Sequence, residues 1–142
     1  MTRINLLAPQ HLTNKHLFAE YRELPRIFTA VRKAVAQGKH PSDFTIPPHY
    51  KLGTGHVTFF YDKLRWLRKR YRDLYTELEQ RNYSLDSDLY AAVCNDAVDL
   101  IVEHKEWAND YTPRPEDIYL NMARLVRRSQ LPAVLVEVTS HD

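Results

Sequence analysis

The sequence has few cysteines, the residues that stabilise many small proteins through disulfide bonds or zinc sites. It contains one cysteine, Cys94, among 142 residues. A single thiol cannot form an internal disulfide and has no cysteine partners for a zinc site, so nothing indicates an oxidising compartment. A chain of this length can bury a core without such staples. We therefore expect one domain, with the cytoplasm as its default location, near the nucleoid in a bacterium or in the host cytoplasm for a virus.

Long apolar runs and glycines are also scarce. No stretch approaches the roughly 18 apolar residues of a membrane-spanning helix, and the N-terminus lacks the long apolar core of a signal peptide. We therefore expect no membrane partner. All three glycines lie between positions 38 and 55, together with Pro41, Pro47 and Pro48. This concentration of chain-breaking residues predicts one long loop.

Charge is divided unevenly along the chain. Residues 1–72 contain 14 Lys and Arg against 4 Asp and Glu, whereas residues 73–142 contain 6 against 14, so charges of +10 and −8 make up the net +2. A basic surface gains affinity for a phosphate backbone because bound counterions are released. Nucleic acid is therefore the leading class of partner, bound through a surface built from residues 1–72. The alternative is that the two halves neutralise one another across an intramolecular or dimer interface.

Apolar residues recur at helical spacing in four stretches, which predicts a mainly α, compact single-domain fold with an irregular N-terminal arm over residues 2–12. The first helix is expected over residues 14–37, bent or interrupted at Pro25 and stopped by Gly38. The others are expected over residues 56–81, 86–108 and 115–128, with a short helical turn near 42–44 and an extended tail or edge strand at 131–138.

A carboxylate stands among cations on the first of these helices. Glu23 shares the face opposite the apolar stripe with Arg22, Arg26 and Lys33. This arrangement suits an acid or base that works beside a phosphate backbone, although an ordinary solvated helix face explains the helix equally simply. Thr2 is small enough to permit removal of Met1. The freed α-amine, with a reference pKa near 7.7–8.0, would be a ready nucleophile at a sugar carbon.

Four segments resemble one known family: MTRINL (1–6), HLFAEYRELPR (16–26), AVRKAV (30–35) and LGTGHVTFFYDKLRWLRKR (52–70). They are similar to the pyrimidine-dimer DNA glycosylase/AP lyases of the phage endonuclease V type. The resemblance implies a compact, mainly helical enzyme that acts on damaged double-stranded DNA and flips a nucleotide out of the duplex. It also implies that the enzyme cleaves the glycosidic bond and nicks the strand by β-elimination, with no metal or organic cofactor.

The resemblance also implies roles for individual residues. Thr2 matches the amine nucleophile and Glu23 the catalytic carboxylate, so the resemblance makes residues 1–72 the basic catalytic and DNA-binding half of the domain and residues 73–142 its acidic helical half. Further positions match or extend the DNA-binding and lesion-binding set: Arg3, His16, Tyr21, Arg22, Arg26, Lys33 and the basic run Arg68, Lys69 and Arg70. For His56, a structural turn explains the residue at least as well as catalysis does.

The second half departs from the family pattern. The chain ends in AVLVEVTSHD, where the family representative has a basic tail rich in Trp and Tyr. The acidic stretch 86–110 is unsuited to lying on DNA, so we expect it to pack on the far side or against another protomer. Three functions therefore stay open: excision of pyrimidine dimers, action on another damaged base or an abasic site, and a non-catalytic DNA-binding module.

Overall fold

The computed structural model describes residues 1–127, and over that range it is built from helices and turns without a named β-strand. The helices are α1 (Asn14–Glu23), α2 (Pro25–Ala36), α3 (Leu64–Gln80), α4 (Ser87–Glu103) and α5 (Pro115–Arg127), with 3₁₀ turns at Pro9–His11, Pro41–Asp43, Thr58–Phe60 and Lys105–Trp107. The mainly α fold is therefore confirmed. The tail expected at 131–138 lies outside the described residues. No helix among residues 1–127 is long and apolar enough to cross a membrane.

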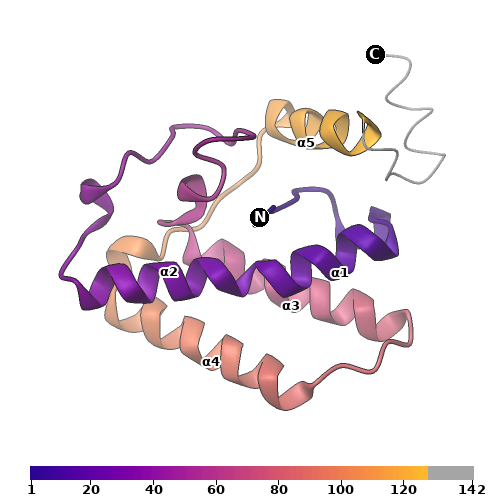
Figure 1. Cartoon of the computed structure of the whole chain (residues 1–142), viewed down its shortest axis with the longest axis horizontal. Coiled ribbons are helices and arrows are strands. Elements are labelled where there is room, and N and C mark those ends of the chain that lie inside the picture. The colour runs from indigo at the N-terminus through magenta and orange to yellow at the C-terminus, as the bar shows by residue number, and fades with distance from the viewer. Residues whose placement is uncertain (128–142) are drawn as a thin grey trace.

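The helices enclose the N-terminal arm (Figure 1). α1 and α2 lie end to end, α3 packs against α1, and α4 packs against α3 and α2. α5 lies on the other side of α1 from α4, and the first residues of the chain run between α5 and α1. The acidic helix α4 therefore lies on the other side of α1 and α3 from the first residues of the chain and α5.

The first helical stretch is interrupted at Pro25, as its sequence predicts. Thr13 caps α1 by accepting a hydrogen bond from the His16 amide at 3.4 Å. Leu24 keeps helical dihedral angles between α1 and α2, and Pro25 occupies the first turn of α2, where its missing N–H removes no hydrogen bond of that helix. Gly38, at φ +74°, ends α2 with the paired backbone hydrogen bonds of a Schellman motif.

The predicted start of the second long helix was wrong. α3 begins at Leu64 rather than at position 56, because Gly53 and Gly55 hold positive φ angles and residues 58–60 form a 3₁₀ turn. This stretch buries both Phe59 and Phe60. Neighbouring residues of an α-helix point about 100° apart, so a continuous helix here would bury Phe59 and Phe60 less easily in the same core.

The predicted end of the next helix was also wrong. α4 ends at Glu103, five residues before the expected position 108, because His104 leaves the helical region with φ −131°. The chain then makes a 3₁₀ turn that buries Trp107 completely, with its ring centroid 5.9 Å from that of Phe44. Burial of this large side chain outweighs continuation of the helix.

Side chains rather than a helix or sheet satisfy the backbone of the N-terminal arm. Residues 4–7 are buried, so their N–H and C=O groups need partners. The Asn121 side-chain oxygen on α5 accepts hydrogen bonds from the amides of Leu6 at 2.7 Å and Leu7 at 3.1 Å. Arg70 on α3 donates to the Leu7 carbonyl at 2.7 Å. The arm is therefore fixed to two helices that lie on opposite sides of it.

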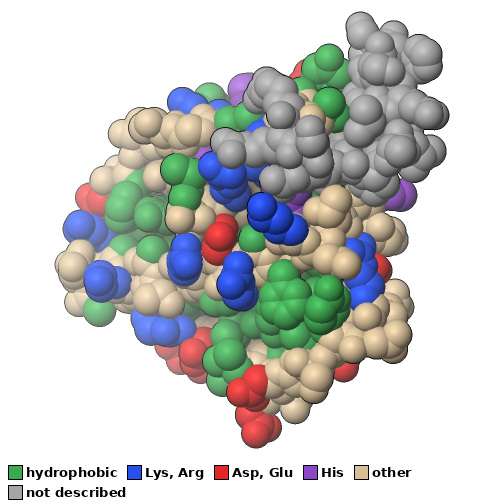
Figure 2. All heavy atoms as spheres, turned by 45° about the vertical axis from the view of Figure 1, so that its right-hand side comes forward, with side chains coloured by type: hydrophobic (Ala, Val, Ile, Leu, Met, Phe, Trp, Pro, Cys, Tyr) green, Lys and Arg blue, Asp and Glu red, His purple; other side chains and the backbone are tan. Residues whose placement is uncertain are grey.

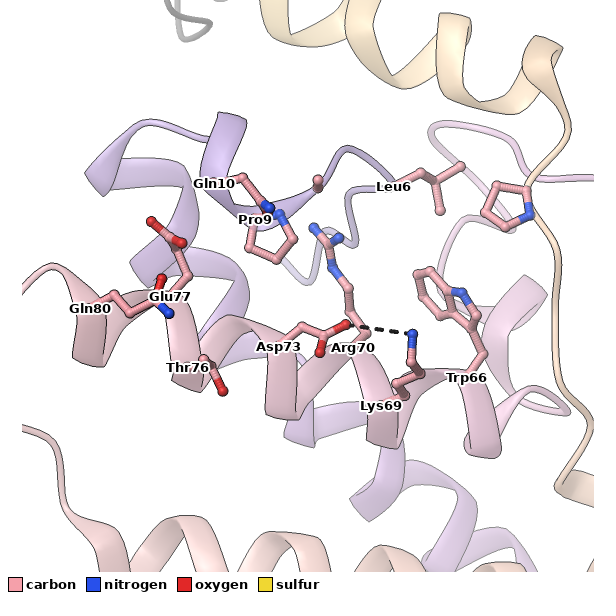
Figure 3. A pocket seen from close by; sticks show the side chains of 12 residues that line it. Leu6, Pro9, Gln10, Trp66, Lys69, Arg70, Asp73, Thr76, Glu77 and Gln80 are labelled. Carbon is pink, nitrogen blue, oxygen red and sulfur yellow. Dashed lines mark ion pairs between the residues drawn. The ribbon is translucent and has the colours of Figure 1, made fainter.

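A buried ion pair lies beneath the arm. Arg70 donates from Nε to Glu20 Oε2 at 2.7 Å and from Nη2 to Oε1 at 2.9 Å. The two side chains are only 6% and 1% exposed, and Asn5 adds a third hydrogen bond to Glu20 at 3.0 Å. Figure 3 shows Arg70 rising from α3 toward the arm, while its neighbour Lys69 pairs with Asp73 beside it.

We expect Arg70→Met to lower the free energy of unfolding by about 3–5 kcal/mol, because it leaves the Glu20 carboxylate buried without its cation. Lys69→Met is the matched control, since Lys69 is 80% exposed and exposed substitutions change stability by less than about 0.5 kcal/mol. Urea unfolding of both variants provides the measurement. Equal midpoints would contradict the assigned role of the buried pair.

Candidate active site

The arm places the beginning of the chain against Glu23. The Arg3 amide donates a hydrogen bond to Glu23 Oε1 at 3.1 Å. Backbone nitrogens of consecutive residues are separated by at most about 3.7 Å, so the Thr2 nitrogen lies within about 7 Å of this carboxylate oxygen. Met1 is 87% exposed. Removal of Met1 would therefore leave a free amine near a carboxylate.

One cavity of about 360 Å³ lies on the Glu23 side of the arm. Its lining brings together three residues expected from the sequence, Arg3, His16 and Glu23, and adds Lys15 from the first turn of α1. Asn5 and Glu20 form part of the wall. Cationic and carboxylate groups thus share a space beside the N-terminus, as acid–base chemistry next to a phosphate requires.

A second cavity, also of about 360 Å³, lies on the other side of the arm. Thr2 and Arg3 line it together with Leu52, Val57 and Arg124, and Met1 borders both cavities. Arg124 is 7% exposed and donates a hydrogen bond to the Asn5 side chain. The N-terminus therefore projects between a polar cavity and one with apolar walls.

The remaining cations of the first helical stretch form an exposed face. Arg22, Arg26 and Lys33 are all exposed, and Arg26 and Lys33 border a shallow hollow of about 380 Å³ along α2. Figure 2 shows Lys and Arg side chains gathered around an acidic side chain on one face of the molecule. The face has the charge needed to follow a phosphate backbone.

Tyr21 does not belong to this face. It is 8% exposed, and its ring stacks on that of Tyr71 with centroids 4.9 Å apart and planes 3° apart. Burial raises the pKa of the Tyr21 phenol. The expectation of a DNA contact is corrected here: within its motif, Tyr21 points inward and fixes α1 to α3.

The basic run 68–70 does not form one phosphate track. Arg70 is buried in its ion pair with Glu20, so it cannot reach DNA without breaking that pair. Arg68 donates to the Cys94 carbonyl of α4 at 3.3 Å, whereas exposed Lys69 borders a hollow of about 470 Å³ between the arm and α3, which buried Arg70 also lines. Consecutive helical residues point about 100° apart, so the three side chains do not share one exposed face.

His56 contacts the arm through its ring. Its Nε2 accepts a hydrogen bond from the Ile4 amide at 2.9 Å, and its Nδ1 lies 2.8 Å from the Lys51 carbonyl oxygen. A carbonyl can only accept, so Nδ1 carries the proton and the ring is neutral. Burial is the largest cause that lowers the pKa of His56, and the nearby Arg124 and Arg3 cations lower it further. The hydrogen bond to the Lys51 backbone carbonyl and the Glu20 charge act in the opposite direction on this pKa.

Sequence reasoning missed Lys15, Asn5 and Arg124 as parts of this site. The one available signal was in α5, where polar residues recur at three- and four-residue spacing at Asp117, Asn121 and Arg124. All three are buried, together with Leu125. A polar stripe on the buried side of a helix indicates a hydrogen-bonded partner, because unpaired burial of such groups is unfavourable. It does not indicate that the partner is the N-terminal arm.

We expect the free energy of unfolding to fall as the pH drops below about 6.5, the ordinary pKa of histidine. Below that pH, His56 binds a proton in the unfolded chain but stays neutral in the folded protein, where its pKa is lowered. One such proton gives a slope of at most about 1.4 kcal/mol per pH unit. Urea unfolding at several pH values between 5 and 7.5 measures this slope. His56→Gln should flatten it, and exposed His49→Gln should not; an unchanged slope in His56→Gln would contradict the assignment.

The site contains no metal centre within residues 1–127, since no three His, Cys, Asp or Glu side chains of that range lie close enough together to hold an ion.

Comparison with protein families shows that residues 1–91 match the family model described as pyrimidine dimer DNA glycosylase. The match covers the arm, α1, α2, the long loop and α3, which supply Thr2, Glu23 and the surrounding cations. The chain therefore belongs to the pyrimidine dimer DNA glycosylase family and is a DNA-repair enzyme for pyrimidine dimers.

Proposed function

We propose that the chain excises pyrimidine dimers through the α-amine of Thr2, assisted by Glu23, and then nicks the strand as an AP lyase. The observation that carries this proposal is the hydrogen bond from the Arg3 amide to Glu23 Oε1 at 3.1 Å. It ties the residue next to Thr2 directly to the carboxylate. A terminal amine is neutral at physiological pH far more often than a lysine, since its reference pKa is near 7.7–8.0 rather than about 10.4.

The chemistry uses three linked steps. The amine nitrogen forms a bond to C1′ of the damaged nucleotide while the glycosidic C1′–N bond breaks, and the departing base takes a proton. The attached nitrogen then loses a proton, the bond from C1′ to the ring oxygen breaks as that oxygen takes a proton, and a protonated imine joins the enzyme to the sugar. Removal of a proton from C2′ then expels the 3′ phosphate oxygen from C3′, which nicks the strand.

Glu23 has two tasks in this scheme. Its carboxylate stabilises the cationic imine across the polar cavity, and it accepts and returns protons during base departure and elimination. Arg3, Lys15 and His16 line the same cavity, which supports a role for them in holding the phosphates next to the lesion.

The partner is double-stranded DNA, approached through the exposed cations of α1 and α2. Arg22, Arg26 and Lys33 would follow the phosphate backbone, and the acidic helix α4 would not contact it. In Figure 1, α4 lies on the other side of α1 from α5. Since the family match identifies a damaged-DNA substrate, the charge distribution supplies the direction of approach.

Borohydride trapping tests the nucleophile. We expect protein without Met1 to form a covalent adduct with an abasic or dimer-containing duplex, because borohydride reduces the imine. Thr2→Ser, which also permits Met1 removal, should trap at a similar rate. Thr2→Leu, which retains Met1 and moves the amine by one residue, should trap at least about 100-fold more slowly, as expected for a misplaced reacting group. Mass spectrometry confirms each N-terminus.

An adduct formed equally well by Thr2→Leu would rule out the Thr2 amine. Absence of any adduct with the processed protein would rule out imine chemistry altogether.

Replacement of the carboxylate tests the second group. We expect Glu23→Gln to bind dimer-containing DNA with unchanged affinity while its glycosylase turnover falls by about 10²–10⁴-fold, the usual contribution of a positioned acid or base. Exposed Glu103→Gln, at the end of α4, is the matched control. Single-turnover kinetics with separate binding measurements distinguish the two effects, and unchanged turnover in Glu23→Gln would remove Glu23 from the mechanism.

A further inference from the structure

Both polar backbone groups of Ile4 are held by side chains of the long loop. His56 Nε2 accepts from the Ile4 amide at 2.9 Å, and the Tyr50 hydroxyl donates to the Ile4 carbonyl at 3.0 Å. Ile4 itself is fully buried. The two loop side chains therefore replace the neighbouring strand that an extended segment normally pairs with.

The loop that carries these side chains is tightly built. Gly55 adopts φ +93°, and a Cβ there would approach Pro47 Cγ to 3.1 Å, so the turn before His56 requires glycine. The His56 ring meets those of Tyr50 and Phe60 edge to face, with centroids 5.4 Å and 5.8 Å away. The ring is thus held on several sides as well as through the Lys51 carbonyl.

Adjacent amides of the arm are held from opposite sides. The Arg3 amide bonds to Glu23 of α1, and the Ile4 amide bonds to His56 of the loop. This is the alternation of an extended chain, in which a slip of one residue would move the N-terminus by about 3.3 Å. Contacts at both residues therefore fix the register of the chain just before the N-terminus.

We propose that His56, together with Tyr50, is a positioning residue for the N-terminal amine: their hydrogen bonds to the Ile4 backbone set the distance between the Thr2 nitrogen and Glu23. This inference rests on the proposed role of the Thr2 amine. Both ring nitrogens of His56 are engaged, Nδ1–H with Lys51 and Nε2 with Ile4. The ring therefore acts on the reaction through the arm and not by direct proton transfer with the substrate.

Matched variants of the full chain without Met1 test this role. His56→Leu removes the acceptor, whereas His56→Gln keeps an acceptor near the position of Nε2. Tyr50→Phe removes only the hydroxyl group. His49→Gln, in the same loop and exposed, is the control. The measurements are kcat and KM on a dimer-containing duplex, the imine-trapping rate on an abasic duplex, and hydrogen exchange of the Ile4 amide.

We expect His56→Leu to lower kcat and the trapping rate by about 10–100-fold with KM nearly unchanged, because displacement of a reacting group by about 1 Å can cost as much as 10²-fold. His56→Gln and Tyr50→Phe should lose less, and His49→Gln should match the parent protein. Exchange at Ile4 should accelerate in the same order, while core amides such as that of Leu67 stay protected.

Two results would overturn the positioning role: full kcat in His56→Leu, or a loss of activity in all three variants that follows global unfolding rather than Ile4 exchange. If His56→Leu does not fold, His56→Gln and Tyr50→Phe decide the matter by the same criteria. Failure of the parent protein to trap would refute the Thr2 mechanism instead, and Ile4 exchange would still show whether His56 holds the arm.

Discussion

The constraint on which the rest of this structure depends is the need to satisfy a buried backbone that belongs to no helix or sheet. The arm passes between α1 and α5 with Ile4 to Leu7 buried, and no strand lies beside it within the described residues. An unpaired amide or carbonyl at such depth costs about as much as a lost hydrogen bond or more. Buried polar side chains, which include Arg70, Asn121 and His56, avoid this cost by forming hydrogen bonds with the arm.

That solution gives the N-terminus an order that chain ends normally lack. Terminal residues usually fray because few groups hold them. Here α1, α3, α5 and the long loop each supply a side chain to the first seven residues. A nucleophile at the end of a chain benefits from such anchoring. The arm then loses its conformational entropy when the protein folds, so ordering it does not add to the barrier of each reaction cycle. The buried Glu20–Arg70 pair is best understood in this way, because a buried ion pair by itself is weak evidence for stability.

Local patterns in the sequence were sufficient for the elements that depend on local rules. Pro25 and Gly38 act through their own dihedral angles, so the interruption and end of the first helical stretch could be predicted. The turns at 58–60 and 105–107 could not, because they depend on where Phe60 and Trp107 find space in the core. Thr2 and Glu23 were proposed from resemblance to a family, whereas the burial of Tyr21 and Arg70 was not predicted, because a motif or basic run does not specify which side chains point inward.

The division of charge along the sequence is not a division of the structure into two bodies. One apolar core includes Leu17 and Leu67 from the basic half and Ala97 and Leu125 from the acidic half. α4 pairs Asp96 with Arg32 of α2 at 3.2 Å, whereas α5 of the same half bonds the arm through Asn121 and Arg124. The acidic half therefore contributes both an outer helix and part of the scaffold that holds the N-terminus. A chain cut between the halves would lose the partners of Asn5, Leu6 and Leu7 on α5, so the basic half by itself could not hold its N-terminus in the same way.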